Sequence, residues 1–125
     1  MTMTTSTRRK RPHLTPEFRR QLTAMRWSLA RTVATTDEEL ATLEPQQPGE
    51  LAEGAATGVV GDLLARLDGR ERHELDEIDA AQRRLEAGVF GVCEGCHRAI
   101  PLARLRAVPT ARRCAICQAR AEAAR

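Results

Sequence analysis

All four cysteines of this 125-residue chain fall into two Cys-x-x-Cys pairs, and their spacing constrains the fold more than any other feature. Cys93 and Cys96 form the first pair, and Cys114 and Cys117 form the second after seventeen intervening residues. This arrangement is typical of a four-cysteine zinc site, in which each pair supplies one edge of a tetrahedron. Because the protein would fill every coordination position, none is left for water or substrate. The pattern therefore predicts one structural Zn²⁺.

Other interpretations of the cysteines are weaker. Two disulfides would require an oxidising compartment, and we find no pattern typical of a signal peptide. A redox Cys-x-x-Cys needs only one pair and usually lies beside a βαβ pattern, which this sequence lacks. Iron in the same set of four sulfurs stays open, because spacing does not distinguish it from zinc. His97 is an alternative ligand, but four cysteines suffice, so we interpret it as a surface residue.

The segment from Val89 to the end has 37 residues, below the length of about 40 at which an apolar core alone usually suffices. Metal binding would supply the missing folding free energy. We therefore expect residues 88–125 to form a zinc-finger domain that ends in a helix from about Cys114 to Ala124. No apolar run approaches the roughly 18 residues that cross a bilayer, so we expect a cytoplasmic protein without membrane contact.

A first helix is predicted from Thr15, with Thr15 as N-cap and Pro16 at the first helical position. Its apolar residues recur at helical spacing and predict one buried seam. They are Phe18, Leu22, Met25, Leu29 and Val33, extended by Leu40 and Leu43. Thr36 precedes three acidic residues in a capping pattern, which favours a kink or break there. Residues 1–14 are basic and poor in apolar side chains, so they predict a disordered tail, either simply solvated or touching a polyanion.

A second helix is predicted from about Glu50 to Ala87, after a turn rich in Pro and Gly. Its apolar positions are Val60, Leu64, Leu67, Leu75, Ile78 and Leu85. At about 1.5 Å per residue, this arm would be on the order of 55 Å long. The two helices predict an all-α fold: a long antiparallel coiled-coil hairpin over residues 15–87, with its tip near 44–55 and the zinc finger at its base.

Charge is unevenly distributed along the chain, although the net charge is only +3. Residues 32–61 carry six acidic residues and no basic one, whereas both ends of the chain are rich in Arg. The hairpin would gather these carboxylates, including Glu50 and Glu53, at its tip. One interpretation is a solvated helix end, and the other is a surface that enters a cationic, recessed site. Such a tip argues against contact with phosphate backbones there.

The zinc segment also contains a longer pattern than the two cysteine pairs. It runs through Phe90-Gly91-Val92-Cys93-Glu94-Gly95-Cys96 and Ile100, then Arg104-Leu105-Arg106-Ala107-Val108-Pro109, Ala111, Cys114 and Cys117. This run resembles the zinc-finger signature of the DksA/TraR family of bacterial transcription regulators. The resemblance implies a hairpin that enters the secondary channel of RNA polymerase toward its catalytic Mg²⁺, while the zinc end docks on the channel rim.

The resemblance also carries over to individual positions. Glu50-Leu51-Ala52-Glu53-Gly54-Ala55 looks like the family's acidic tip pattern Asp-x-x-Asp-x-Ala, with Glu at both acidic positions. It implies that Glu50 and Glu53 modulate the polymerase. The positions that match the family's pocket for the alarmone ppGpp are Glu74, Glu77, Val108 and Gln118. Two carboxylates without a cation should repel a polyphosphate, so we expect no ppGpp binding there.

Together these patterns predict a non-enzymatic, monomeric regulator that binds RNA polymerase, without direct sequence-specific DNA binding. The alternative is a DNA-binding zinc finger that uses its Arg-rich zinc domain and basic tail. In both interpretations, the cysteines of residues 88–125 have a structural role. A zinc hydrolase is disfavoured, because four cysteines leave no coordination position for an activated water.

Overall fold

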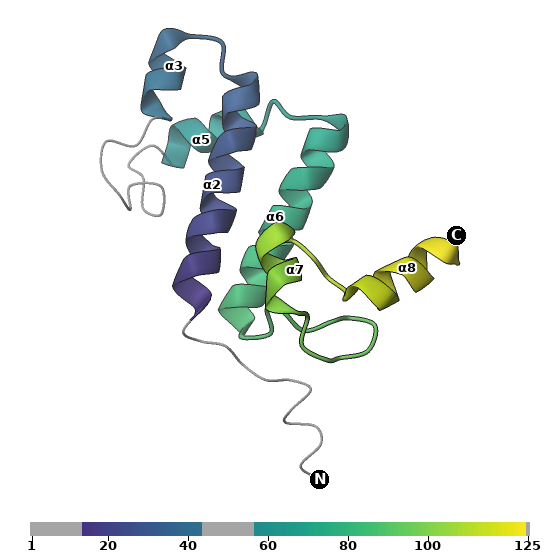
Figure 1. Ribbon diagram of the computed structural model, residues 1–125. Helices are drawn as coiled ribbons and strands as arrows, with labels where there is room; N and C mark the ends of the chain where they lie inside the picture. The colour runs from purple at the N-terminus through teal and green to yellow at the C-terminus, as the bar shows by residue number, and fades with distance from the viewer. Residues whose placement is uncertain (1–13, 44–56, 125) are drawn as a thin grey trace.

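The structure, a computed structural model, describes residues 14–43 and 57–124 (Figure 1). These residues form helices α2 (Thr15–Val33), α3 (Asp37–Thr42), α5 (Thr57–Leu64), α6 (Gly69–Ala87), α7 (Leu102–Ala107) and α8 (Ala115–Ala123). Within the described ranges there is no strand, only an isolated antiparallel bridge between Val92 and Ala99. The predicted all-α fold is confirmed.

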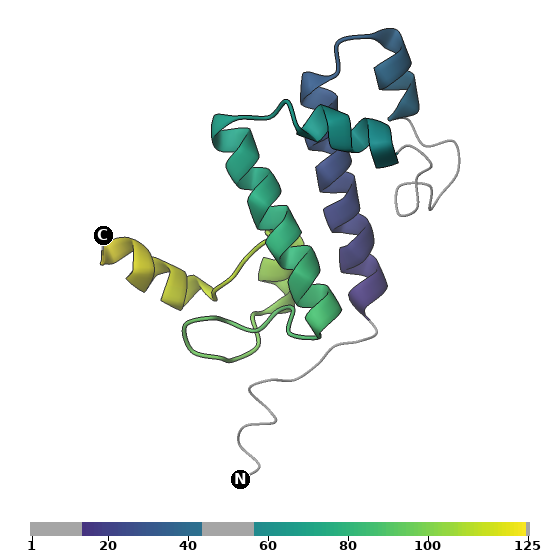
Figure 2. The same ribbon diagram turned by 180° about the vertical axis from the view of Figure 1, so that it is seen from behind.

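Helices α2 and α6 lie side by side and run in opposite directions, as both views of the ribbon show (Figures 1 and 2). Their facing sides bury a continuous apolar cluster together with residues of α5. The cluster consists of Leu22, Trp27, Leu29, Ala30, Leu43, Val60, Leu63, Leu64, Leu67, Leu75, Ile78 and Ala81. An ion pair between Arg26 and Asp79 crosses the same interface. The predicted antiparallel hairpin is therefore confirmed, with its apolar seams as the core.

The first arm of the hairpin breaks where its capping residues predict a break. α2 ends at Val33, and α3 begins after Thr36, whose side chain accepts a hydrogen bond from the Glu39 amide at 3.1 Å. The Glu39 carboxylate in turn accepts from the Thr36 amide at 3.3 Å, which completes a capping box. At the other end of α2 the assignment of Thr15 as N-cap is wrong: Leu14 holds that position and Thr15 is the first helical residue.

The second arm is not the single helix predicted over residues 50–87. α5 ends at Leu64, and α6 starts only at Gly69, whose φ of 57° is left-handed and favours glycine. α5 turns across α2 instead of continuing the line of α6 (Figures 1 and 2). This turn buries Leu63 and Leu64 in the hairpin core. The predicted arm of about 55 Å is wrong, since the 19 residues of α6 span about 28 Å.

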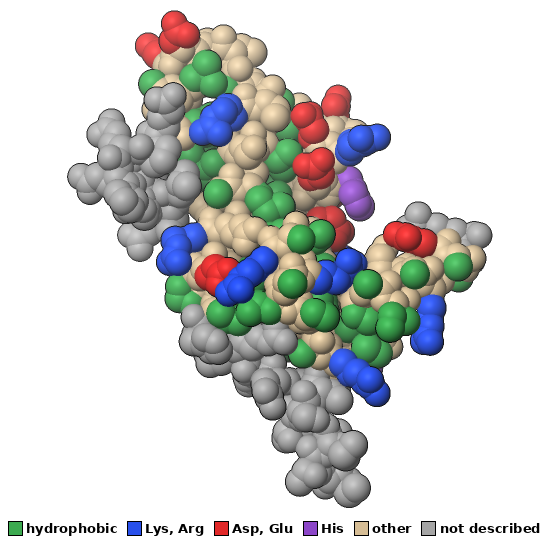
Figure 3. All heavy atoms as spheres, in the orientation of Figure 1, with side chains coloured by type: hydrophobic (Ala, Val, Ile, Leu, Met, Phe, Trp, Pro, Cys, Tyr) green, Lys and Arg blue, Asp and Glu red, His purple; other side chains and the backbone are tan. Residues whose placement is uncertain are grey.

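The acidic end of the hairpin is partly neutralised within the chain. Arg66 donates to the Glu39 carboxylate at 2.7 Å and to the Val33 carbonyl at 3.2 Å. The hydrogen bond from Arg66, followed by one from the Thr35 amide, lowers the pKa of Glu39 to about 2. Asp37 and Glu38 remain exposed, and acidic side chains gather at the α3 end of the molecule (Figure 3). Glu50 and Glu53 lie outside the described residues.

A second apolar cluster joins the hairpin to the segment that holds the cysteines. Phe18, Cys93, Ile100, Leu105 and Ala111 are buried in it. The rings of Phe18 and Phe90 are 5.0 Å apart between centroids at an interplanar angle of 45°. Leu85 and Phe90 pack against both clusters, so the two cores are continuous at the base of the hairpin.

No helix in the described part of the chain is long and apolar enough to traverse a lipid bilayer.

Replacing Phe18 by Ala should lower the free energy of unfolding by about 3–5 kcal/mol, because it empties a fully buried ring site at the joint. Denaturant unfolding in the presence of zinc, followed by circular dichroism, measures this change. Arg19→Ala is the matched control, since Arg19 is exposed on the same helix. A loss below about 1 kcal/mol for Phe18→Ala would contradict the assignment of this joint.

Candidate metal centre

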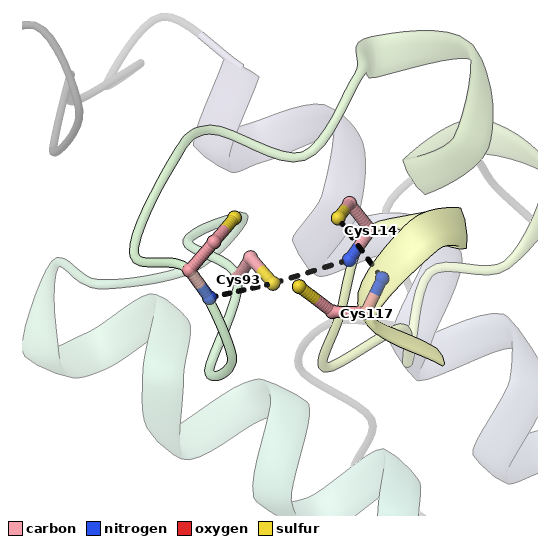
Figure 4. A group of neighbouring side chains, drawn as sticks. Cys93, Cys114 and Cys117 are labelled. Atoms are coloured by element: carbon pink, nitrogen blue, oxygen red, sulfur yellow. Dashed lines mark hydrogen bonds between the residues drawn. The ribbon is translucent and has the colours of Figure 1, made fainter. Parts of the chain in front are cut away.

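The four cysteines come from two short segments that the fold brings together at the base of the hairpin, and Figure 4 labels Cys93, Cys114 and Cys117. Cys93 and Cys96 lie in the loop after α6, where the Val92–Ala99 bridge closes a tight knuckle. Cys114 is the N-cap of α8, and Cys117 lies in the first turn of that helix. The predicted C-terminal helix is thus confirmed, and it starts at the second cysteine pair.

The ligand atoms of all four cysteines lie within 4.8 Å of one another. Four sulfurs at about 2.3 Å from a tetrahedral Zn²⁺ are separated by roughly 3.8 Å, so this cluster is of the size such an ion needs. All four thiols are free rather than joined in disulfides. Of the residues that the structure describes, these four make up the group of His, Cys, Asp and Glu side chains able to hold a metal. The predicted ligand set and a single structural zinc ion fit this geometry.

Backbone amides stabilise the thiolate of Cys93. Burial raises the pKa of this thiol, but the amides of Cys114, Cys96 and Gly95 donate to its sulfur and together lower the pKa to about 6. Their nitrogen-to-sulfur distances are 3.3, 3.4 and 3.3 Å, respectively. The Cys117 amide donates to the Cys114 sulfur in the same way at 3.5 Å. These donors orient the sulfurs and favour the charged form that a metal requires.

Full ionisation of the four crowded sulfurs would require a cation. Hydrogen bonding to the Cys114 and Cys93 sulfurs, together with burial, raises the pKa of Cys117 to about 12. Four thiolates this close together repel one another, so they can all ionise only if a positive ion shares their charge. A bound Zn²⁺ would hold the two segments together and, with four protein ligands, would offer no position for substrate.

Two positions in the first knuckle are restricted, Gly95 by the space beside Cys117 and His97 by its backbone conformation. A Cβ on Gly95 would lie 2.9 Å from both the Cβ and the Sγ of Cys117, so only glycine lets the two knuckles approach this closely. His97 adopts a left-handed φ of 63° and is exposed. It lies outside the group of potential ligands in the described residues, in agreement with its interpretation as a surface residue.

Ion pairs attach the zinc segment to both arms of the hairpin. Arg106 donates to Glu17 of α2 at 2.9 and 3.2 Å. Arg112 donates to Glu77 of α6 at 2.8 and 3.0 Å and to Glu94 of the first knuckle at 3.2 Å. The hydrogen bonds from Arg112 lower the pKa of Glu77. Together the two arginines contact both helices of the hairpin, and this fixes the orientation of the base.

The Arg112 contact corrects one expectation about the pocket positions Glu74, Glu77, Val108 and Gln118. The sequence places no cation among them, yet the guanidinium of Arg112 lies against Glu77. The Arg112 guanidinium is already shared by two carboxylates, and Glu74 and Val108 are exposed.

Sequence reasoning also missed helix α7 and the role of Arg112. An Arg and a Glu four residues apart on one helix can be recognised as a pair in the sequence. Arg112 and Glu77 are 35 residues apart, so their pairing leaves no such pattern.

A hollow of about 490 Å³ lies beside the metal centre, between the end of α6 and the first knuckle. Its lining is mainly apolar and consists of Arg84, Gly88, Val89, Val92, Cys93, Glu94 and His97. Arg84 donates to the Thr110 carbonyl at 3.4 Å, and burial lowers its pKa. Its Nη1 is buried without a partner among the described residues. The zinc end therefore has a recessed surface with one arginine beneath it.

Replacing Cys96 by Ser should abolish stoichiometric zinc binding, because a hydroxyl is a poor substitute for a thiolate ligand. His97→Gly is the matched control: it removes the neighbouring imidazole, suits the left-handed backbone and should retain one zinc per chain. Elemental analysis of the purified proteins measures the metal, and the spectrum of the Co²⁺-substituted protein reports its sulfur ligands. Full zinc occupancy in Cys96→Ser, or its loss in His97→Gly, would overturn the ligand assignment.

The chain is similar in sequence to known proteins that contain a four-cysteine zinc finger. Residues 88–123 match the family model of the prokaryotic dksA/traR C4-type zinc finger. The chain is 36% identical over 74 residues to an uncharacterized protein of Aquifex aeolicus, a match that covers 59% of this chain and 51% of that protein. It is 35% identical over 94 residues to the RNA polymerase-binding transcription factor DksA of Caulobacter vibrioides, covering 75% of this chain and 66% of that protein. The matches thus span from about half to just under two thirds of these relatives.

A solved structure agrees with these sequence matches. The structure of transcription factor DksA2 from Pseudomonas aeruginosa is similar with a TM-score of 0.57 and 29% identity, and the match covers 88% of this chain and 84% of that chain. The similarity thus includes the hairpin as well as the zinc segment. With its four clustered sulfurs, its helical hairpin and these relatives, the chain belongs to the DksA/TraR family.

Proposed function

We propose that this protein is a non-catalytic regulator of transcription that binds RNA polymerase. The observation that carries the proposal is the four-cysteine centre packed against the base of an antiparallel hairpin, in a chain similar to proteins named as RNA polymerase-binding transcription factors. A metal held by four cysteines supports a structural role for the zinc end. The protein acts, in this proposal, as a monomer in the cytoplasm.

In the proposed mechanism the two ends of the molecule have different tasks. The zinc end docks on the rim of the polymerase secondary channel, and the hollow beside Cys93 offers it a recessed surface for this contact. The hairpin enters the channel, and Glu50 and Glu53 bring two carboxylates toward its cationic interior. These residues follow α3 and precede α5 in the sequence.

The alternative of a DNA-binding zinc finger has less support. It needs a free basic face on the zinc end, yet Arg106 and Arg112 are held by carboxylates of the chain itself. Arg104 donates through Nε to the Arg113 carbonyl at 2.9 Å, which turns this side chain back onto the protein. Since phosphate contacts by Lys and Arg dominate DNA affinity, such internal pairing weakens this interpretation.

Removing both tip carboxylates should separate binding from regulation. We expect Glu50→Gln/Glu53→Gln to co-purify with core RNA polymerase as the unchanged protein does, because the zinc end is intact, but to lose most of its effect on transcription in vitro. Asp76→Asn/Glu86→Gln, which removes two exposed carboxylates from α6, is the matched control and should retain the effect.

The outcomes distinguish the two parts of this proposal. An undiminished transcriptional effect of Glu50→Gln/Glu53→Gln would remove the tip assignment and leave polymerase binding in place. Failure of the unchanged protein to co-purify with core RNA polymerase would contradict the proposed function itself.

We further expect no ppGpp binding at the positions that match the family's pocket. Glu74 and Glu77 present two carboxylates, and Arg112 is already paired with Glu77, so these positions repel a polyphosphate even though Arg113 donates to Gln118 at 3.4 Å. Isothermal titration calorimetry of ppGpp with the polymerase complex should give the same heat for the unchanged protein, Val108→Ala and Gln118→Ala. A ppGpp affinity that either variant abolishes would contradict this expectation.

A further inference from the structure

The two arms of the hairpin are interrupted at the same level. α2 ends at Val33 and α3 begins at Asp37, while α5 ends at Leu64 and α6 begins at Gly69. Arg66 joins the two interruptions, because its guanidinium donates to the Val33 carbonyl at 3.2 Å and to the Glu39 carboxylate at 2.7 Å. α3 and α5, together called the cap, each connect to the rest of the hairpin through one of these adjacent breaks, and α5 packs across α2 (Figures 1 and 2).

The apolar residues of the second arm are compatible with another packing. Val60, Leu64 and Leu67 recur at steps of four and three, and Leu75 and Ile78 continue the same helical spacing on α6. This seam would be unbroken if α5 and α6 formed one helix. In the folded cap, by contrast, Leu40 and Val59 are each 37% exposed. The cap therefore leaves apolar surface uncovered, although the sequence places Leu40 on the first-arm seam that a straight hairpin would bury.

The break between α5 and α6 lacks a side-chain cap at the start of α6. Asp68 occupies the N-cap position of α6 but makes no side-chain capping hydrogen bond, unlike Thr36 at the start of α3. Gly69 has a left-handed φ of 57°, and a Cβ there would meet nothing within 4 Å. The backbone turn at this break thus depends on the burial of Leu63 and Leu64, on the conformational freedom of glycine and on the contacts of Arg66. Removing the glycine or the arginine would favour a continuous helix.

We propose that α3 and α5 form a hinged cap that opens about the two facing breaks, so that the protein exchanges between a capped hairpin and a straight, longer one, with Arg66 as the latch of the capped form. Opening would extend the first arm by the ten residues from Ala34 to Leu43, or about 15 Å. The two forms would use largely the same apolar side chains, which is what allows two packings of one sequence to be close in free energy. The inference concerns the isolated protein and is independent of polymerase binding.

Two substitutions act on the two supports of the capped form. Gly69→Ala disfavours the left-handed turn and favours helix, so it should shift the ratio of straight to capped molecules by roughly 10- to 100-fold. Arg66→Ala removes the latch and should shift it in the same direction. Gly61→Ala is the control for the first variant, since Gly61 is helical and a Cβ there also meets nothing within 4 Å. Arg70→Ala, which replaces an exposed arginine of α6, is the control for the second.

The zinc-loaded full chain is examined by small-angle X-ray scattering and by the Cα chemical shifts of residues 65–68. We expect Gly69→Ala and Arg66→Ala to increase the maximum dimension by about 15 Å and to move these shifts to helical values, whereas the two controls match the unchanged protein. An unaltered dimension with non-helical shifts in Gly69→Ala, or a loss of helix in either test variant, would overturn the proposal. So would an unchanged protein that already has the straight form.

Discussion

Four sulfurs that lie within 4.8 Å of one another are the constraint on which the base of this molecule depends. Thiolates this close repel unless a cation shares their charge, and a tetrahedral metal is the means by which a segment of this size acquires a stable fold. Cys93 connects the centre to the rest of the protein, because its sulfur accepts amide hydrogen bonds while its side chain is buried among Phe18, Ile100 and Leu105. The metal and the apolar joint thus stabilise one and the same structure.

The orientation of the hairpin on this base is set by contacts that are individually modest. Each arm contributes a carboxylate, Glu17 from α2 and Glu77 from α6, and each is paired with an arginine of the zinc segment. Partly exposed ion pairs of this kind contribute little to stability, but two of them on opposite arms restrict rotation about the Phe18–Phe90 contact. They also pair two basic side chains of this end with carboxylates of the chain itself, which weakens the interpretation of this end as a surface for nucleic acid.

Sequence reasoning predicted best where a structure is set by neighbours in the chain. The two cysteine pairs, the capping box at Thr36 and the seam from Phe18 to Val33 all depend on residues within a few positions, and the structure has them. It failed at the second arm, where periodicity suggested one helix through Gly69. Four glycines weaken that arm's first half in sequence, yet the position of the break follows from burial of Leu63 and Leu64 on α2 and from Arg66.

By itself, then, the sequence determined the metal ligands, the helical class, the pairing of two amphipathic arms and the family resemblance, because each is written in local spacing. Only the tertiary structure decided where the second arm turns, which carboxylates the arginines neutralise and how the base is oriented. Arg66 meets Val33 and Glu39 across 33 and 27 residues of chain, and Arg112 meets Glu77 across 35. Contacts at such separations depend on how whole helices pack, and no periodicity along the chain encodes them.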